Sequence, residues 1–244
     1  MSVAYVSLDV GGSSKNSGIE PGDAEKREGE SEEEGEESAV HAVETALAST
    51  TRLVVRGPAG AGKTTLVHWV AVRAASADFE YPLEDWNSAL PLVVRLRQVA
   101  DSPLPRPEDF PSLVAPTIAD TMPRGWVHRR LDSGKAVVMV DGVDEVAEHR
   151  RVEVRNWVKE LVDTFPKCRF IVTSRPHAVE QHWLESSEFD DADLQPMDTE
   201  GIDTFIDHWH KAVAEEVSRA CRKSQGRSEV ESRRPAVGDE PAAL

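Results

Sequence analysis

Short apolar runs alternate with longer amphipathic segments along most of the chain. The apolar runs predict strands at residues 53–56, 92–96, 136–140, 170–173 and 192–194. Helical spacing predicts helices at residues 39–49, 63–75, 152–164 and 201–221, the last as one or two helices. Strands that alternate with helices of this size are typical of βαβ units. The pattern therefore predicts an α/β fold with a mainly parallel sheet.

Two regions depart from this alternation. Residues 102–116 contain five prolines and predict an irregular connection. Residues 118–133 are expected to be helical in part, with interruptions at Pro123 and Gly125. Near the amino terminus, residues 4–10 are compatible with a short strand.

The charge is concentrated in one stretch. The net charge is -16, and residues 20–37 contain ten acids against Lys26 and Arg27. Residues 11–38 have almost no apolar content, so we interpret them as a disordered linker, with an acidic interaction tail as the alternative. The expected organisation is a strand in residues 1–10, the linker at 11–38, a nucleotide-binding domain at 39–222 and a disordered tail at 223–244.

Composition also limits the possible partners and compartments. An acidic chain does not favour nonspecific contact with nucleic acid or an anionic membrane. Cys168 and Cys221 have no metal-ligand spacing. No apolar run approaches the roughly 18 residues that a membrane helix needs, and no signal-peptide pattern is present at the amino terminus. We therefore expect a cytoplasmic protein.

The segment "RLVVRGPAGAGKTTLVHWVA" contains a candidate phosphate-binding loop. A strand precedes it, an amphipathic helix follows, and Gly57, Gly62, Lys63 and Thr64 have the spacing of a P-loop. Backbone N–H groups of such a loop and the positive end of the helix bind phosphate. We expect Lys63 to contact the β- and γ-phosphates, the Thr64 hydroxyl to bind Mg²⁺, and Thr65 to contact the α-phosphate. The predicted nucleotide-binding residues are Gly57, Pro58, Ala59, Gly60, Ala61, Gly62, Lys63, Thr64 and Thr65.

The apolar run "AVVMV" ends in the acidic turn "DGVDE". Crowded carboxylates are unfavourable without a compensating cation, so we expect Asp141 to be a partner of the same Mg²⁺ as Thr64, either as a direct ligand or through a water molecule or another ligand. Glu145 is a candidate base or water-orienting group, and Asp144 a candidate for either task. For Asp144 the alternative is an acid that stabilises the start of a following helix. Arg175 follows the next apolar run and is a candidate γ-phosphate contact, with an ordinary surface arginine as the alternative.

Taken together, "GPAGAGKTT", "VVMVDGVDEV" and "VTSRP" resemble the NACHT class of signal-transduction NTPases (STAND class), over roughly residues 50 to 210. "PLVVRLR" and "LQPMDTEGIDTFIDHW" agree with the same family. The resemblance implies a three-layer P-loop sandwich with a mainly parallel five-stranded sheet, in which the "TSRP" strand lies between the P-loop and "DGVDE" strands. It also implies a switch in which diphosphate holds a closed form and triphosphate favours oligomerisation. Bacterial members often act in defence or regulation.

About 35 residues follow Trp209, too few for the lid, winged-helix and sensor regions of the family. We therefore expect a fragment, a truncated product or a chain whose effector or sensor domain comes from a partner. The predicted function is an NTP-binding switch with Mg²⁺ and slow hydrolysis, for ATP rather than GTP because no guanine-reading "NKxD" element follows the loop. A nucleotide-binding scaffold without turnover is the alternative from another class, and a phosphotransferase would need an acceptor site that the sequence does not display.

Overall fold

The computed structural model describes residues 9–12 and 40–195, together with Asp203, Asp207 and His210, which are helical. Residues 9–12 and 40–195 belong to one compact unit, and the following description concerns that unit. The predicted acidic linker and carboxyl-terminal tail, and most of the helix predicted at 201–221, lie outside the described residues. None of the helices in the described part of the chain is long and apolar enough to cross a membrane.

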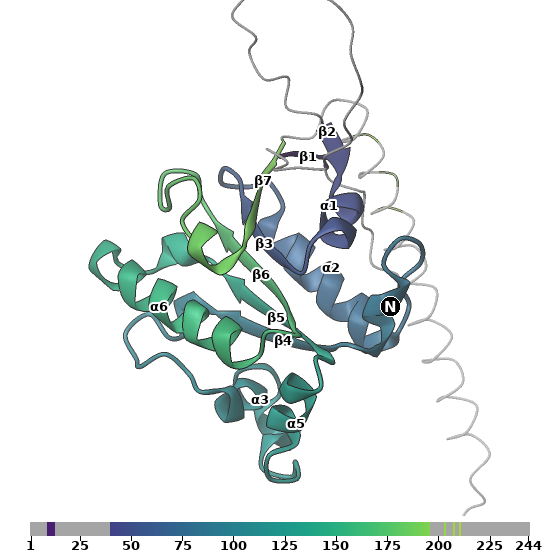
Figure 1. The fold of residues 1–244 in the computed structure, drawn as a ribbon, viewed down its shortest axis with the longest axis vertical. Coiled ribbons are helices and arrows are strands. Elements are labelled where there is room, and N and C mark those ends of the chain that lie inside the picture. Colours follow the sequence, from purple (N-terminus) through teal and green to yellow (C-terminus); the bar gives the residue numbers. More distant parts are fainter. Residues whose placement is uncertain (1–8, 13–39, 196–202, 204–206, 208–209, 211–244) are drawn as a thin grey trace, which may run out of the picture. The chain divides into compact units, whose positions relative to one another are not determined.

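A seven-stranded sheet has the order β2-β1-β7-β3-β6-β5-β4 (Figure 1). Its strands are β1 (Asp9–Gly12), β2 (Val40–Ala42), β3 (Arg52–Arg56), β4 (Leu90–Arg95), β5 (Ala136–Asp141), β6 (Arg169–Ser174) and β7 (Asp190–Leu194). The five strands from β7 to β4 are parallel, which confirms the predicted fold class. Strand β6 lies between β3 and β5, as the family resemblance implies. Strands β1 and β2 extend the sheet beyond β7 in antiparallel pairing.

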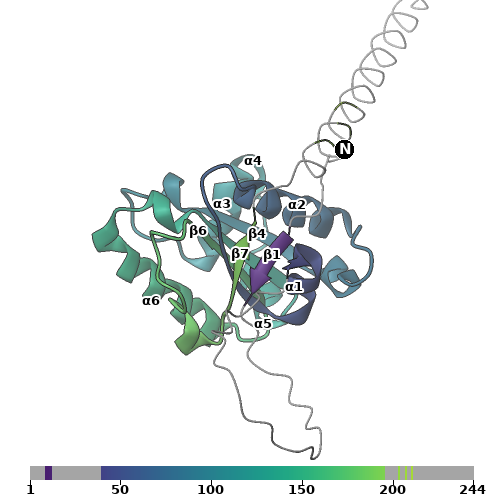
Figure 2. The same ribbon diagram turned by 90° about the horizontal axis from the view of Figure 1, so that it is seen from above.

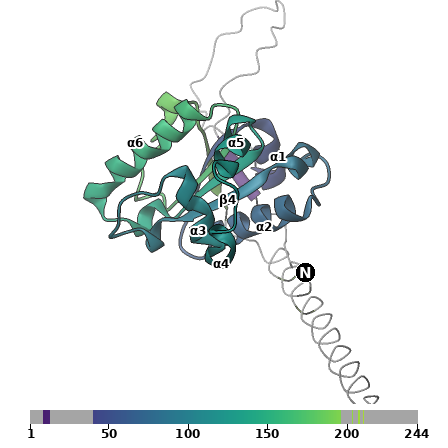
Figure 3. The same cartoon turned by 90° about the horizontal axis from the view of Figure 1, so that it is seen from below.

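Helices cover both faces of this sheet. They are α1 (Val43–Ser49), α2 (Lys63–Ser76), α3 (Phe110–Val114), α4 (Pro116–Ala119), α5 (Trp126–Asp132) and α6 (Glu148–Thr164). Figure 2 shows α6 on one side of the sheet and α1 and α2 on the other. Helices α3 and α4 lie near β4, the edge strand of the parallel part (Figure 3). The arrangement has three layers, helix, sheet and helix.

The hydrophobic core consists of side chains that are buried on both faces of the sheet. All six residues of β5 are buried. Alternate residues of β5 and β6, such as Val138 and Val172, pack in one cluster with Val154 and Val158 of α6. The intervening residues of both strands are buried as well, and because side chains alternate along a strand they face the α2 side. This two-sided burial explains why the strands are uninterrupted apolar runs in the sequence.

Several predicted boundaries are wrong. Residues 40–42 form β2 rather than the start of a helix, and β1 lies at Asp9–Gly12, so that Gly11 and Gly12 belong to a strand instead of a linker. Helix α6 begins at Glu148, four residues earlier than predicted.

The proline-rich segment is more regular than predicted. Pro107, Pro111 and Pro116 each stand in the first turn of a short helix. Proline is tolerated there because its missing N–H would have no partner within the helix and its φ is already helical. Three of the five prolines of this segment therefore mark helix starts, and the prediction of an irregular connection is wrong for residues 107–114 and 116.

Two valines of α6 provide a matched test of this packing. Val158 is 0% exposed and Val152 is 63% exposed. We expect Val158→Ala to lower the free energy of unfolding by about 2 kcal/mol, because it removes buried methyl groups and leaves a cavity. Val152→Ala should change it by less than about 0.5 kcal/mol. Urea unfolding followed by circular dichroism measures both, and equal losses would contradict the assigned burial of α6.

Candidate functional site

The predicted phosphate-binding loop connects β3 to α2 and turns sharply at two glycines. Gly60 has φ +82° and Gly62 has φ +91°, conformations that side-chain-bearing residues rarely adopt. Gly62 precedes the first residue of α2, and its carbonyl accepts a hydrogen bond from the Leu66 N–H at 2.8 Å. The amino-terminal end of a 14-residue helix therefore opens directly onto the loop.

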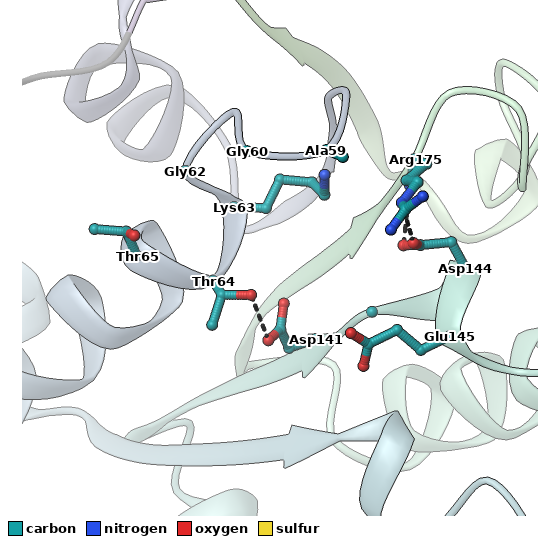
Figure 4. Close-up of a pocket in the computed structure, with 11 residues that line it drawn as sticks. Ala59, Gly60, Gly62, Lys63, Thr64, Thr65, Asp141, Asp144, Glu145 and Arg175 are labelled. Carbon is teal, nitrogen blue, oxygen red and sulfur yellow. Dashed lines mark hydrogen bonds and ion pairs between the residues drawn. The ribbon is translucent and has the colours of Figure 1, made fainter. Parts of the chain in front are cut away.

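A cavity of about 280 Å³ lies between this loop and the carboxyl ends of β5 and β6 (Figure 4). It is lined by Ala59, Gly60, Gly62, Lys63, Thr64, Thr65, Asp141, Gly142, Asp144, Glu145 and Arg175. The structure thus brings together residues from three separate motifs of the sequence. Ligand sites of open α/β sheets occupy this position, outside the carboxyl ends of the strands.

Three of the predicted nucleotide-binding residues, Gly57, Pro58 and Ala61, are not among the cavity-lining residues. The Gly57 N–H donates to the Ser174 carbonyl at 3.2 Å and so continues the strand pairing. A Cβ atom at position 57 would lie 3.1 Å from Cβ of Leu194. Glycine at position 57 therefore favours the close packing between the loop and β7.

The Lys63 ammonium group is held by the loop itself. Its Nζ donates to the carbonyl of Gly57 at 2.6 Å and to that of Pro58 at 2.9 Å. Burial lowers the pKa of Lys63 below its ordinary value, and the positive charge of Arg175 acts in the same direction. The carboxylates of Asp144, Asp141 and Glu145 oppose this effect. An anion in the cavity would favour the protonated form of Lys63, since an opposite charge nearby stabilises the charged state.

Asp141 is the buried carboxylate of the site. It is 6% exposed and stands at the end of β5. Its Oδ2 accepts a hydrogen bond from the Thr64 hydroxyl at 3.1 Å, and its Oδ1 accepts one from the Thr173 hydroxyl at 2.6 Å. Mg²⁺ prefers oxygen ligands and is usually held by one or two protein groups together with phosphates and water. The neighbouring Thr64 and Asp141 oxygens fit that donor set.

Asp144 and Arg175 form an ion pair at the cavity wall (Figure 4). The Arg175 Nε lies 2.7 Å from Oδ2 of Asp144, and the Arg175 backbone N–H donates to Oδ1 at 3.1 Å. Asp144 lies in a 3₁₀ turn, Val143–Glu145, that ends before α6 begins at Glu148. Asp144 therefore does not stand in the first turn of α6. The arginine is 56% exposed and has Asp144 as a specific partner.

Glu145 is exposed and folds back over Gly142. A Cβ atom at position 142 would lie only 2.8 Å from Oε2 of Glu145, and Gly142 has φ +85°. Glycine at this position therefore allows both the turn and the placement of the glutamate. The Glu145 carboxylate lines the cavity on the same side as Asp141, open to solvent.

No motif of the sequence indicated a role for Thr173. It is a fully buried polar residue in a strand of apolar side chains, and it bonds both Asp141 and the Gly142 N–H. A hydroxyl group at the end of a buried apolar run, like the carboxylate at the end of the run before it, is the sequence signal that could have identified Thr173. Among the described residues no group of three or more His, Cys, Asp or Glu side chains is arranged to hold a metal ion by itself.

Comparison with known families gives a match to the NACHT domain over residues 51–213, more than half of the chain. A similar solved structure is titled "Structure of Drosophila ORC bound to AT-rich DNA and Cdc6", at 11% identity and a TM-score of 0.36. The alignment covers 67% of this chain and 29% of that chain, so this chain spans less than a third of its length. Comparison with curated proteins gave no match.

The pKa of Lys63 is open to direct measurement. We expect the ammonium group of Lys63 to titrate below 10.5 in the protein without nucleotide, because burial disfavours its charged form. Reductive ¹³C-methylation followed by NMR across alkaline pH measures this titration, and Lys63→Arg assigns the resonance. A midpoint at or above 10.5 would contradict the described environment of Lys63.

Proposed function

Because the chain belongs to the NACHT family of nucleotide-binding NTPases, we propose that it is a switch that binds ATP with Mg²⁺ and hydrolyses it slowly. Its proposed setting is signal transduction or bacterial defence. The observation that carries the proposal is one cavity lined by a glycine-rich loop, Lys63, the Thr64–Asp141 pair and Glu145. The proposal also includes oligomerisation in the triphosphate-bound state and an effector or sensor domain from another chain. Family membership is the only support for these two points.

The binding half of the function follows from charge and geometry. Loop amides and the start of α2 provide positive potential for phosphates. Lys63 exchanges its two loop carbonyls for phosphate oxygens, which are stronger acceptors because they are charged. Thr64 and Asp141 would hold Mg²⁺, which would supply charge neutralisation on the phosphates. ATP is preferred over GTP in this proposal because no guanine-reading element was found in the sequence.

The hydrolytic half of the function rests on Glu145. Its carboxylate lines the cavity beyond Asp141, where it can accept a proton from, or orient, a water molecule facing the γ-phosphate. Turnover is expected to be slow because Glu145 is exposed to solvent, which weakens electrostatic effects.

Arg175 is proposed to exchange partners when triphosphate binds. Its ion pair with Asp144 is half exposed on the arginine side, so its net contribution is at most about 1 kcal/mol. A γ-phosphate is a better bidentate partner for a guanidinium group than a single carboxylate oxygen. This exchange distinguishes triphosphate from diphosphate, since only the former supplies the new partner.

A nucleotide-binding scaffold without turnover is the second candidate. In this second candidate Lys63, Thr64 and Asp141 are sufficient for nucleotide binding. The Arg175–Asp144 ion pair persists and keeps the arginine away from the phosphate. Phosphate release separates the two candidates.

The first test uses three lysine and glutamate variants. Lys63→Ala should weaken ATP binding at least about tenfold, because it removes a charged donor. Glu145→Gln should bind ATP normally and lower phosphate release about 100-fold or more. Lys135→Ala, at the opposite end of β5, is the matched control and should change neither. Calorimetry and a phosphate-release assay measure these effects. Tight binding without turnover in the wild type would favour the scaffold.

The second test concerns the partner exchange. We expect Asp144→Asn to raise the affinity for a non-hydrolysable ATP analogue up to about fivefold relative to ADP, because the ion pair no longer competes for Arg175. Arg175→Ala should reduce the preference for triphosphate. Competition binding of both nucleotides measures the ratio. If Asp144→Asn instead abolished turnover with the ratio unchanged, Asp144 would be a catalytic residue and not the resting partner of Arg175.

A further inference from the structure

The side chain of Thr173 is 0% exposed, and its hydroxyl group both donates and accepts a hydrogen bond. Its Oγ1 donates to Oδ1 of Asp141 at 2.6 Å and accepts from the Gly142 N–H at 3.0 Å. The first distance is at the short end of the range for an O–H···O bond, as expected when the acceptor is a carboxylate. Thr173 thus contacts both the proposed metal ligand and the turn that follows it.

The sheet itself sets this contact. Strands β5 and β6 are parallel neighbours whose register pairs Val140 with Val172. Asp141 and Thr173 are the next residues on their strands, so they end side by side. Because side chains alternate along a strand, the side chains of Asp141 and Thr173 both face the α2 layer, which contains Thr64. A hydroxyl placed here by regular strand geometry is held more rigidly than one on a loop.

Two consequences follow for the site. Because Oδ1 of Asp141 is occupied by Thr173, the carboxylate is oriented with Oδ2 toward Thr64. The Gly142 N–H bond also fixes the positive-φ turn that begins the segment carrying Asp144 and Glu145. One buried hydroxyl thereby orients the Asp141 carboxylate and fixes the start of the turn that carries Asp144 and Glu145.

We propose that Thr173 is a positioning residue that directs one oxygen of Asp141 toward Mg²⁺ and fixes the turn that carries Glu145. This inference rests on the proposed nucleotide-binding function. A hydroxyl that merely satisfied buried polar groups would affect stability alone when removed. A positioning residue affects the binding of the metal separately from the binding of the nucleotide.

The experiment compares Thr173→Val, which keeps the shape and removes the hydroxyl, with Thr173→Ser, which keeps the hydroxyl. ADP binding is measured by calorimetry in EDTA, and Mn²⁺ binding, as a probe for Mg²⁺, by electron paramagnetic resonance at saturating ADP. Thr164→Val, which removes an exposed hydroxyl at the end of α6, is the matched control. Thermal unfolding establishes that each variant is folded, and Thr173→Ala replaces the valine variant if that one does not fold.

We expect Thr173→Val to bind ADP in EDTA within about twofold of the wild type and to lose at least about tenfold in Mn²⁺ affinity, since removing a partner of a metal ligand has effects of this size. Thr173→Ser should stay within about threefold of the wild type, and Thr164→Val should be unchanged. A folded valine variant with wild-type Mn²⁺ affinity, or equal losses in the valine and serine variants, would overturn the role of Thr173 alone. A folded wild-type protein that binds no ADP would overturn the proposed function as well.

Discussion

The structure depends on a carboxylate buried at the end of β5, an interior strand of the sheet. Asp141 is 6% exposed, and its described partners are the two hydroxyls of Thr64 and Thr173. No lysine, arginine or histidine in the described part of the chain forms an ion pair with it. Burying a charge without an ion-pair partner is unfavourable, and the two hydroxyl bonds together with the more distant charge of Lys63 compensate for it only in part. We interpret this residual cost as the physical basis for binding a cation at the site.

The rest of the site is arranged around that charge by the order of the strands. Placing β6 between β3 and β5 puts Thr173 and Arg175 between the phosphate-binding loop and the acidic turn. Lys63 and Arg175 are held by neighbouring acceptors, the loop carbonyls and Asp144. Both cations are therefore positioned at the cavity before any anion enters, which lowers the ordering cost of binding.

The sequence predicted what is local and missed what is non-local. The loop from Gly57 to Thr65 and the acidic turn were identifiable because glycine spacing and a charged strand end are visible in a few consecutive residues. The pairing of Arg175 with Asp144, and of Thr173 with Asp141, joins residues more than 30 positions apart and depends on the register of β5 and β6. Residues 40–42 show helical spacing, yet they pair with β1, which lies far from them in the sequence. Proline was interpreted as a breaker in residues 102–116, but helix starts tolerate it as well as loops do.

The most direct test of the account is the stability of Asp141→Asn measured without nucleotide or divalent metal. The asparagine keeps the size of the side chain and an acceptor for Thr173, and it removes the buried charge. If the carboxylate is retained for a cation, the variant should be at least as stable to urea as the wild type and should lose Mg²⁺-dependent nucleotide binding. A loss of more than about 2 kcal/mol in the free energy of unfolding would instead place Asp141 among the residues that hold the fold together, and would contradict the account.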